Sequence, residues 1–176
     1  FSEEALINRT NADLVNNLGN LVNRTIGMAK KYFDGVVENK EVVEDIDNEF
    51  KAQILGLKDS INNDIDKFRI ADSLEKVIEA YRRCNKYIDE TMPWVLAKDE
   101  SKKKRLATVI YNLIEAIRII TVYLQAYLPD TADKIFEQIN TDIKDYDSVQ
   151  VFGKYPSGNK VNEPEVLFKR IEKVEE

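Results

Sequence analysis

The sequence predicts an all-α fold, an antiparallel bundle of four to five helices followed by an irregular C-terminal strap. Apolar residues recur three or four positions apart over most of the chain, which is the period of a helix with one buried face. Charged residues make up 33% of the sequence, and only six glycines and four prolines interrupt its 176 residues. That length is typical of one domain with a substantial hydrophobic core.

The first three helices are delimited by their flanking residues. Ser2 is a helix-capping residue type, and the pair Asp34-Gly35 ends the first helix because glycine favours the backbone conformation that stops a helix. A second helix is predicted from Val42 to Asp66. A third runs from Ile70 to Thr91 and is stopped by Pro93, with a short ordered connection after it.

The fourth helix, about Lys102 to Tyr127, is the most apolar and is predicted to occupy the centre of the bundle. From residue 106 to residue 128 only Glu115 and Arg118 are charged, a run long enough to cross a bilayer. That charged pair would be costly in lipid, so we expect a buried core helix with the two side chains paired at i, i+3 and no membrane contact. Pro129 starts a short fifth helix, Asp130–Ile139.

The helical period fails after residue 140, where glycines and prolines mark irregular structure. We therefore divide the chain into a helical bundle, residues 1–140, and a strap, residues 141–176. The strap ends in an apolar cluster that includes Leu167, Phe168 and Ile171.

The composition excludes several classes of active site. There is no histidine, so the chain holds no Ser–His or Cys–His nucleophile pair and no imidazole metal ligand. The single cysteine, Cys84, permits no internal disulfide and is expected to be a packing residue. Together with the absence of a visible targeting segment, this favours a reducing, cytoplasmic location and predicts no metal site.

The net charge of −6 is concentrated in residues 34–66, which carry ten acidic and three basic side chains. The other segments are close to neutral and can approach a phosphate backbone. Four consecutive basic residues, Lys102 to Arg105, stand at a helix start, where positive charge opposes the helix dipole. A contact with RNA phosphate and a solvated helix end both fit this run.

A helical wheel separates two faces of the first helix. With Leu14 at 0°, the apolar side chains Leu18, Leu21, Val22 and Thr25 fall within about 80° of it. Asn16, Asn20 and Arg24 fall near about 200°, 240° and 280°, on the opposite side. Amides and a guanidinium offer the donors and acceptors that read base edges, although a solvated polar face has the same pattern.

Trp94 is the only tryptophan and directly follows Pro93, outside any helical core stripe. It fits two roles. One is a plug that fixes the corner between the third and fourth helices, and the other is an exposed ring on which a base stacks.

Four stretches in order resemble the anticodon-binding domain of methionyl-tRNA synthetase, a class I aminoacyl-tRNA synthetase. They are Asn11–Arg24, the Pro-Trp-x-x-Ala-Lys signature within Thr91–Lys98, Glu115–Ile120 with Leu128–Ala132, and Leu167–Glu172, where Lys169 replaces the usual proline. The resemblance covers nearly the whole chain. It implies recognition of the CAU anticodon of methionine and initiator tRNAs, with Asn16, Asn20 and Arg24 hydrogen-bonding the bases and Trp94 stacking under the first of them.

The resemblance also implies what this chain lacks. The family's catalytic half carries a His-x-Gly-His-type motif and a Lys-Met-Ser-Lys-Ser loop, and neither occurs here. We therefore expect the C-terminal, tRNA-binding part of the enzyme, inactive alone, with ATP and zinc belonging to the catalytic half, towards which residues 167–172 would pack. Two alternatives stay open: a helical protein-interaction scaffold, and the anticodon domain of another class I enzyme such as the cysteinyl or leucyl one.

Overall fold

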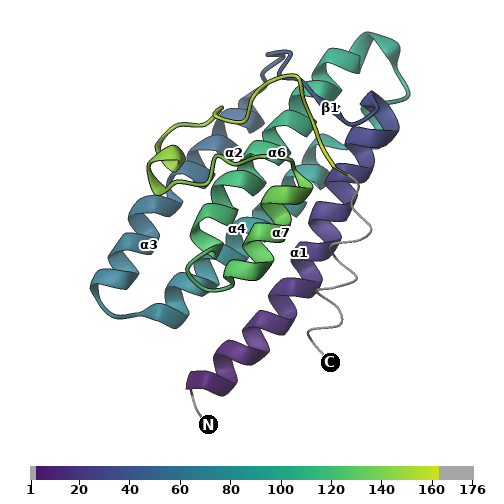
Figure 1. Cartoon of the computed structure of the whole chain (residues 1–176). Helices are drawn as coiled ribbons and strands as arrows, with labels where there is room; N and C mark the ends of the chain where they lie inside the picture. Colours follow the sequence, from purple (N-terminus) through teal and green to yellow (C-terminus); the bar gives the residue numbers. More distant parts are fainter. Residues whose placement is uncertain (1–2, 163–176) are drawn as a thin grey trace.

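The protein is a bundle of helices with one small two-stranded antiparallel sheet (Figure 1), which confirms the predicted fold class. The computed structural model describes residues 3–162, with side chains from residue 14 onward, so the predicted cluster at residues 167–172 lies outside the described residues. The elements are α1 (Glu3–Phe33), β1 (Val36–Val37), α2 (Asp45–Leu55), α3 (Leu57–Asp66), α4 (Ile70–Thr91), α5 (Pro93–Leu96), the 3-10 turn η1 (Glu100–Lys102), α6 (Lys103–Leu124), α7 (Pro129–Gln138), the 3-10 turn η2 (Tyr146–Gln150) and β2 (Asn159–Lys160).

Helix α6 forms the centre of the bundle, as its apolar sequence predicts. Every residue from Arg105 to Leu124 is buried, and α1, α2, α4, α5 and α7 all contact this helix. The segment Glu100–Leu124 is long and apolar enough to cross a membrane, but its apolar window is entirely covered by other parts of the structure. A helix that is apolar on all sides needs such a cover, so α6 is the core helix of the bundle.

The predicted pair inside α6 is confirmed, and it also fastens the strap. Glu115 and Arg118 are both fully buried, and Arg118 Nε donates to Glu115 Oε1 at 2.5 Å. Arg118 also donates to Ser148 Oγ at 2.8 Å, while Glu115 Oε2 accepts the backbone amides of Gly153 and Lys154 at 2.5 Å each. A buried ion pair needs such extra partners to offset its desolvation. Residues 143–154 are thereby held against the core.

The predicted single helix from Val42 to Asp66 is wrong, because the chain forms two helices that break at Gly56. A Cβ at Gly56 would lie 3.3 Å from the carbonyl oxygen of Ala52, closer than an ordinary contact, and the Gly56 amide donates to that oxygen. The buried residues of both helices nevertheless keep the predicted spacing: Phe50, Ile54, Leu57 and Ile61. The apolar period thus identified the buried face but not the break.

Helix α1 ends where the sequence predicts, and the end leads into a sheet that the sequence did not indicate. Asp34 and Gly35 have φ values of 55° and 86°, and their amides bond Lys30 O and Ala29 O in the double hydrogen bond of a Schellman end. Residues 36–37 then pair antiparallel with residues 159–160 of the strap. The strap therefore returns to the end of α1.

The turn between α3 and α4 contains a strained residue. Phe68 has a φ of 58°, in the left-handed region that bulky side chains rarely adopt, and its side chain is 90% exposed. This turn lies at the opposite end of α4 from Pro93 (Figure 1), and so far from the region described next.

Candidate nucleic-acid interface

The two faces of α1 predicted by the helical wheel are present in the structure. The apolar face is buried against the bundle: Leu14, Leu18, Leu21, Val22 and Thr25 are each at most 1% exposed. Asn16, Asn20 and Arg24 are exposed on the other side, one helical turn apart from each other. The helix therefore presents two amides and a guanidinium to solvent in one row.

The corner after α4 brings Trp94 to the surface. Met92 adopts the left-handed conformation, with φ 47° and ψ 65°, and ends α4 after Thr91. Pro93 is buried at the first position of α5, where its missing amide hydrogen leaves no bond unmade. Trp94 is 40% exposed, and its neighbours Met92 and Val95 are 45% and 43% exposed. Trp94 is thus not a buried plug, and part of its ring faces solvent.

Arg24 and Trp94 meet, although 70 positions separate them in the sequence. The guanidinium carbon of Arg24 lies 5.5 Å from the centroid of the Trp94 ring, within the range of a cation–π contact. Asn20 and Asn16 lie one and two turns further back along α1, about 6 and 12 Å along its axis. The structure therefore places all four predicted residues on one exposed region, which we call the α1–α5 ridge: Asn16, Asn20, Arg24 and Trp94.

The four basic residues Lys102–Arg105 are not all available for contact with phosphate. Lys102, Lys103 and Lys104 are exposed, but Arg105 is buried and cannot serve the RNA contact considered for it. Arg105 donates to both carboxylate oxygens of Asp47, at 2.5 Å and 3.0 Å, and to the carbonyl oxygen of Val42 at 2.8 Å. The reason is positional, since residue 105 is the first position of α6 that turns into the core.

Asp47 is the centre of a buried network below the corner that carries Trp94. It is fully buried and accepts a hydrogen bond from the Tyr87 hydroxyl at 2.6 Å, besides the two from Arg105. Asn112 donates to the same hydroxyl at 3.1 Å, and Phe50 stacks on the Tyr87 ring with centroids 4.1 Å apart. Tyr87 and Arg105 flank the corner in sequence, so one carboxylate ties together both elements that hold Trp94.

The electrostatics of this network follow from its bonds. Burial raises the pKa of Asp47, but the hydrogen bonds from Arg105, Tyr87 and the Glu44 amide outweigh it and hold the pKa below its ordinary value. Burial also raises the pKa of the Tyr87 hydroxyl, so the proton that it donates to Asp47 stays in place. Sequence reasoning missed this network. The only sequence signal for this network is the position of Asp47, an acidic residue three positions before Phe50 on the apolar face of the helix.

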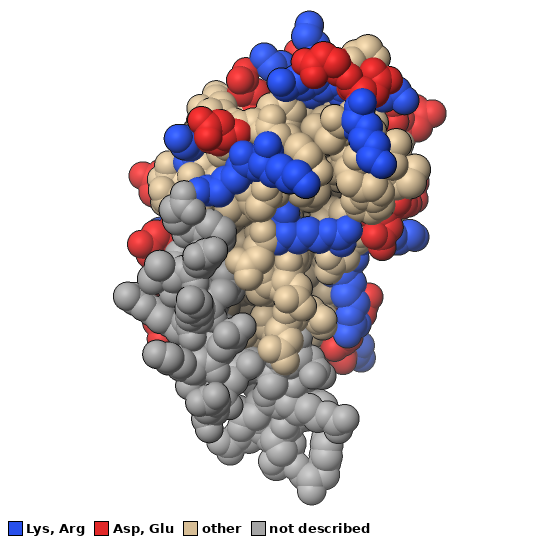
Figure 2. Space-filling model, turned by 90° about the vertical axis from the view of Figure 1, so that its right-hand side faces the viewer, with Lys and Arg blue, Asp and Glu red and all other residues tan. Residues whose placement is uncertain are grey.

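The surface around α1 is mixed in charge. Figure 2 shows that basic side chains gather, next to acidic ones, at the upper end of the face that α1 borders, the end where α1 finishes in Figure 1. Further basic side chains cross the uncharged surface in the middle of this view and continue down its right edge. A surface of mixed sign differs from that of a general nucleic-acid coat, which is usually basic.

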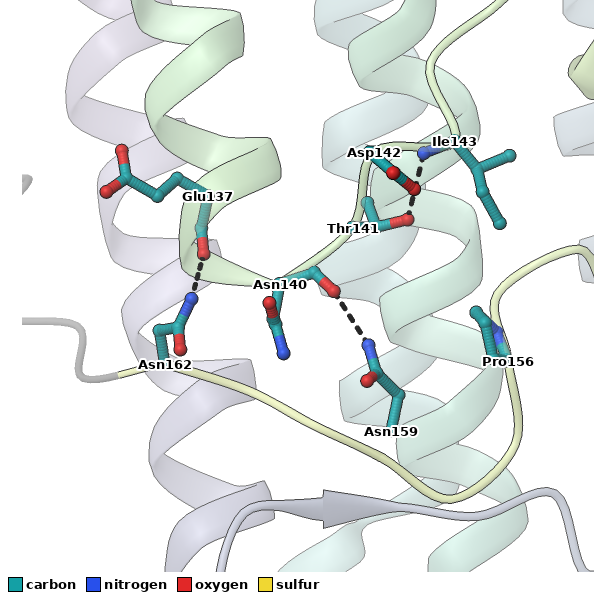
Figure 3. Close-up of a pocket in the computed structure, with 8 residues that line it drawn as sticks. All are labelled: Glu137, Asn140, Thr141, Asp142, Ile143, Pro156, Asn159 and Asn162. Atoms are coloured by element: carbon teal, nitrogen blue, oxygen red, sulfur yellow. Dashed lines mark hydrogen bonds between the residues drawn. The ribbon is translucent and has the colours of Figure 1, made fainter.

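A hollow of about 400 Å³ lies between the end of α7 and the strap (Figure 3). The Asn162 amide donates to Glu137 O at 2.6 Å, and the Asn159 amide donates to Asn140 O at 2.7 Å. These hydrogen bonds hold the strap against the end of α7, so the polar groups around the hollow have a structural role. Among the residues that the structure describes, no three His, Cys, Asp or Glu side chains form a metal-binding group.

Comparison with known proteins identifies the family of the chain. Residues 37–176 match the family described as the anticodon binding domain of methionyl tRNA ligase. The chain is 44% identical to the methionine–tRNA ligase of Clostridium acetobutylicum and 40% identical to that of Bacillus subtilis, over its whole length, and spans 28% and 27% of those proteins. The free form of Mycobacterium tuberculosis methionyl-tRNA synthetase matches 96% of this chain, and 34% of its own, with a TM-score of 0.82 and 30% identity.

These matches name the methionyl enzyme, so the alternative of a cysteinyl or leucyl relative is set aside. They extend over the bundle and the strap alike. The chain belongs to the family of anticodon-binding domains of methionyl-tRNA ligases.

Proposed function

We propose that the α1–α5 ridge recognises the CAU anticodon of methionine and initiator tRNAs. The observation that carries the proposal is the contact between Arg24 and Trp94, because it joins a base-reading donor and a stacking platform at one exposed point. Asn16 and Asn20 extend the same face with amide donors and acceptors. A stacked base and its hydrogen-bonded edge need this combination of groups side by side.

The domain discriminates between anticodons through the hydrogen bonds that a wrong base fails to form. Stacking on Trp94 contributes roughly 1–3 kcal/mol with little sequence preference, since every base has an aromatic face. Selectivity comes from Asn16, Asn20 and Arg24, because a wrong base leaves their donors or acceptors desolvated and unpaired. The cation–π contact holds the guanidinium of Arg24 in place before RNA binds, so less side-chain entropy is lost on binding.

The chain spans under a third of its curated relatives, so the activity of the whole enzyme is part of the proposal. In it, this domain supports the ATP-dependent attachment of methionine to tRNA by holding the anticodon, while a catalytic part outside this chain binds ATP and, in some members, zinc. The strap from residue 141 onward would face that part, and the enzyme would work in the cytoplasm.

The test is a titration of the 176-residue chain with two anticodon stem-loops that differ only in having CAU or a scrambled triplet. Trp94 is the only tryptophan, so its fluorescence reports stacking directly. We expect quenching at much lower concentrations of the CAU loop than of the scrambled loop. Arg24→Ala should weaken CAU binding by about 1–3 kcal/mol, roughly 5- to 150-fold in Kd, measured by anisotropy.

Matched controls come from the other parts of the bundle. Arg69→Ala removes an exposed arginine at the opposite end of α4, about 33 Å along that helix, and Asn63→Ala removes an exposed amide on α3. Neither should change the affinity for the CAU loop. Equal binding of both loops, or an undiminished affinity in Arg24→Ala, would instead favour a helical scaffold that binds proteins.

A further inference from the structure

The exposed face of α1 continues beyond Arg24 towards the end of the helix. Gly27 and Lys31 fall near about 220° and 260° on the wheel that places Asn20 and Arg24 near about 240° and 280°. Both residues are exposed. Lys31 lies about 10 Å along the helix axis from Arg24. The row of groups on α1 is therefore longer than the α1–α5 ridge.

Gly27 has no structural need to be glycine. Apart from its chain neighbours and the nearby backbone of α1 itself, no described atom lies within 4 Å of the position that a Cβ would take, and its φ is not in the left-handed region. Glycine in a helix interior is the poorest helix former after proline, so the fold would gain from alanine at this position. What glycine supplies is bare helix backbone, which permits the close approach of another molecule.

A hollow of about 180 Å³ lies one turn further along, between the last turn of α1, α5, η1 and the start of α6. Its lining includes Lys31, Tyr32, Leu96, Ala97, Lys103 and the acids Asp99 and Glu100. Two cations and two carboxylates therefore line one small space, and Glu100, which is 89% exposed, lies 3.8 Å from the Lys103 ammonium. The carboxylate of Asp99 is already engaged, because it accepts from the Ser101 amide at 3.0 Å and from the Ser101 hydroxyl at 2.7 Å.

The hollow and the α1–α5 ridge share the helices α1 and α5. Trp94 contacts Arg24, and Leu96, two residues later on α5, lines the hollow together with Lys31. The short helix α5 thus has Trp94 next to Arg24 and Leu96 in the same hollow as Lys31. When one base of an RNA strand stacks on Trp94, the phosphate on one side of that base is directed towards the hollow.

We propose that this hollow holds the sugar–phosphate unit of a nucleotide that directly flanks the CAU triplet. Lys31 and Lys103 neutralise its phosphate, and Gly27 lets the strand pass close to the α1 backbone. The inference rests on the proposed function, since it needs the triplet on the ridge. It adds a subsite that is independent of base identity, because its contacts are to the backbone.

The first test measures the salt dependence of stem-loop binding by the 176-residue chain and by Lys31→Met. Loss of one phosphate contact should weaken binding of the CAU and scrambled loops alike and lower the slope of log K against log salt by about 1. The ratio between the two loops should not change. The matched control, Lys67→Met, removes an exposed lysine at the α3–α4 turn and should leave the slope as it is.

The second test locates the phosphate. Stem-loops carry a single uncharged methylphosphonate on the 5′ or the 3′ side of the triplet. One of them should bind the wild-type chain more weakly than the unmodified loop does, and Lys31→Met should bind both equally. If neither modification matters, or the slope of Lys31→Met equals that of the wild type, the subsite is absent, whatever the preference for CAU.

The third test uses Gly27→Ala, which separates folding from binding. The variant should melt at or above the temperature of the wild type and yet bind the CAU loop more weakly. Unchanged affinity would remove Gly27 from the subsite. The proposed function fails by a different result, an equal affinity for the CAU and scrambled loops, so the two ideas are judged by separate measurements.

Discussion

Removal of the Asp47 carboxylate should destabilise the domain more than any exposed substitution, because it leaves buried partners without an acceptor. Asp47→Ala strands the Tyr87 hydroxyl and the Arg105 guanidinium, whose side chain is only 7% exposed. Breaking a buried pair in this way costs about 3–5 kcal/mol. Arg105 keeps its bond to Val42 O and an ion pair with Glu44 at 3.3 Å, so we expect the lower end, about 3 kcal/mol.

The assay is urea unfolding followed by circular dichroism, with melting temperature as a second measure. A loss of 3 kcal/mol in a domain of this size corresponds to a fall in Tm of roughly 6–12 °C. Asp45→Ala, an exposed acid in the first turn of α2, serves as the control and should change stability by about 0.5 kcal/mol. In the double variant Asp47→Ala/Arg105→Met the losses should not add, because the stranded charge is gone.

A loss below about 1 kcal/mol for Asp47→Ala, or full additivity in the double variant, would refute the view that this carboxylate joins three helices. The same variant tests the corner. Because Tyr87 and Arg105 flank the segment that carries Trp94, its fluorescence maximum should shift in the folded state at low denaturant, whereas Asp45→Ala should leave it unchanged.

Other consequences can be checked directly. In the folded protein the pKa of Asp47 lies below its ordinary value of 3.8. The stabilisation by its carboxylate is therefore complete above about pH 4 and is lost as the pH falls through the folded pKa. Between pH 7 and pH 3 the urea midpoint of Asp47→Asn should fall less than that of the wild type. Glu115→Ala should cost about 3–5 kcal/mol and speed hydrogen exchange at the amide of Gly153. Phe68→Gly should raise stability by about 1 kcal/mol through relief of its left-handed strain, a rise visible in the urea midpoint. Burial raises the pKa of the Cys84 thiol, so a thiol reagent should react only with unfolded protein.

Local signals in the sequence were sufficient for most helix ends and for the face of α1. The Asp34-Gly35 end, the stop at Pro93 and the start at Pro129 each depend on the backbone preferences of one or two residues. The wheel placed Asn20 and Arg24 on the exposed side because helix geometry alone fixes which residues share a face.

Features that depend on distant contacts were not accessible in this way. The burial of Arg105 follows from the position of Asp47, 58 residues away, and nothing in the basic run itself distinguishes it from its neighbours. The pairing of residues 36–37 with residues 159–160 also joins distant segments. The contact between Arg24 and Trp94 was implied only through the family resemblance, since spacing along one helix says nothing about α5.

The central position of α6 has a consequence for how the chain is made. A ribosome releases α1, α2, α3 and α4 before α6, yet core residues of these helices, among them Leu21, Val77 and Ile88, are buried in a bundle that has α6 at its centre. Until α6 emerges, these helices can pack only on one another and the side chains that face α6 stay uncovered; such surfaces favour aggregation or chaperone binding. The core of the bundle is therefore completed only after α6 has been synthesised.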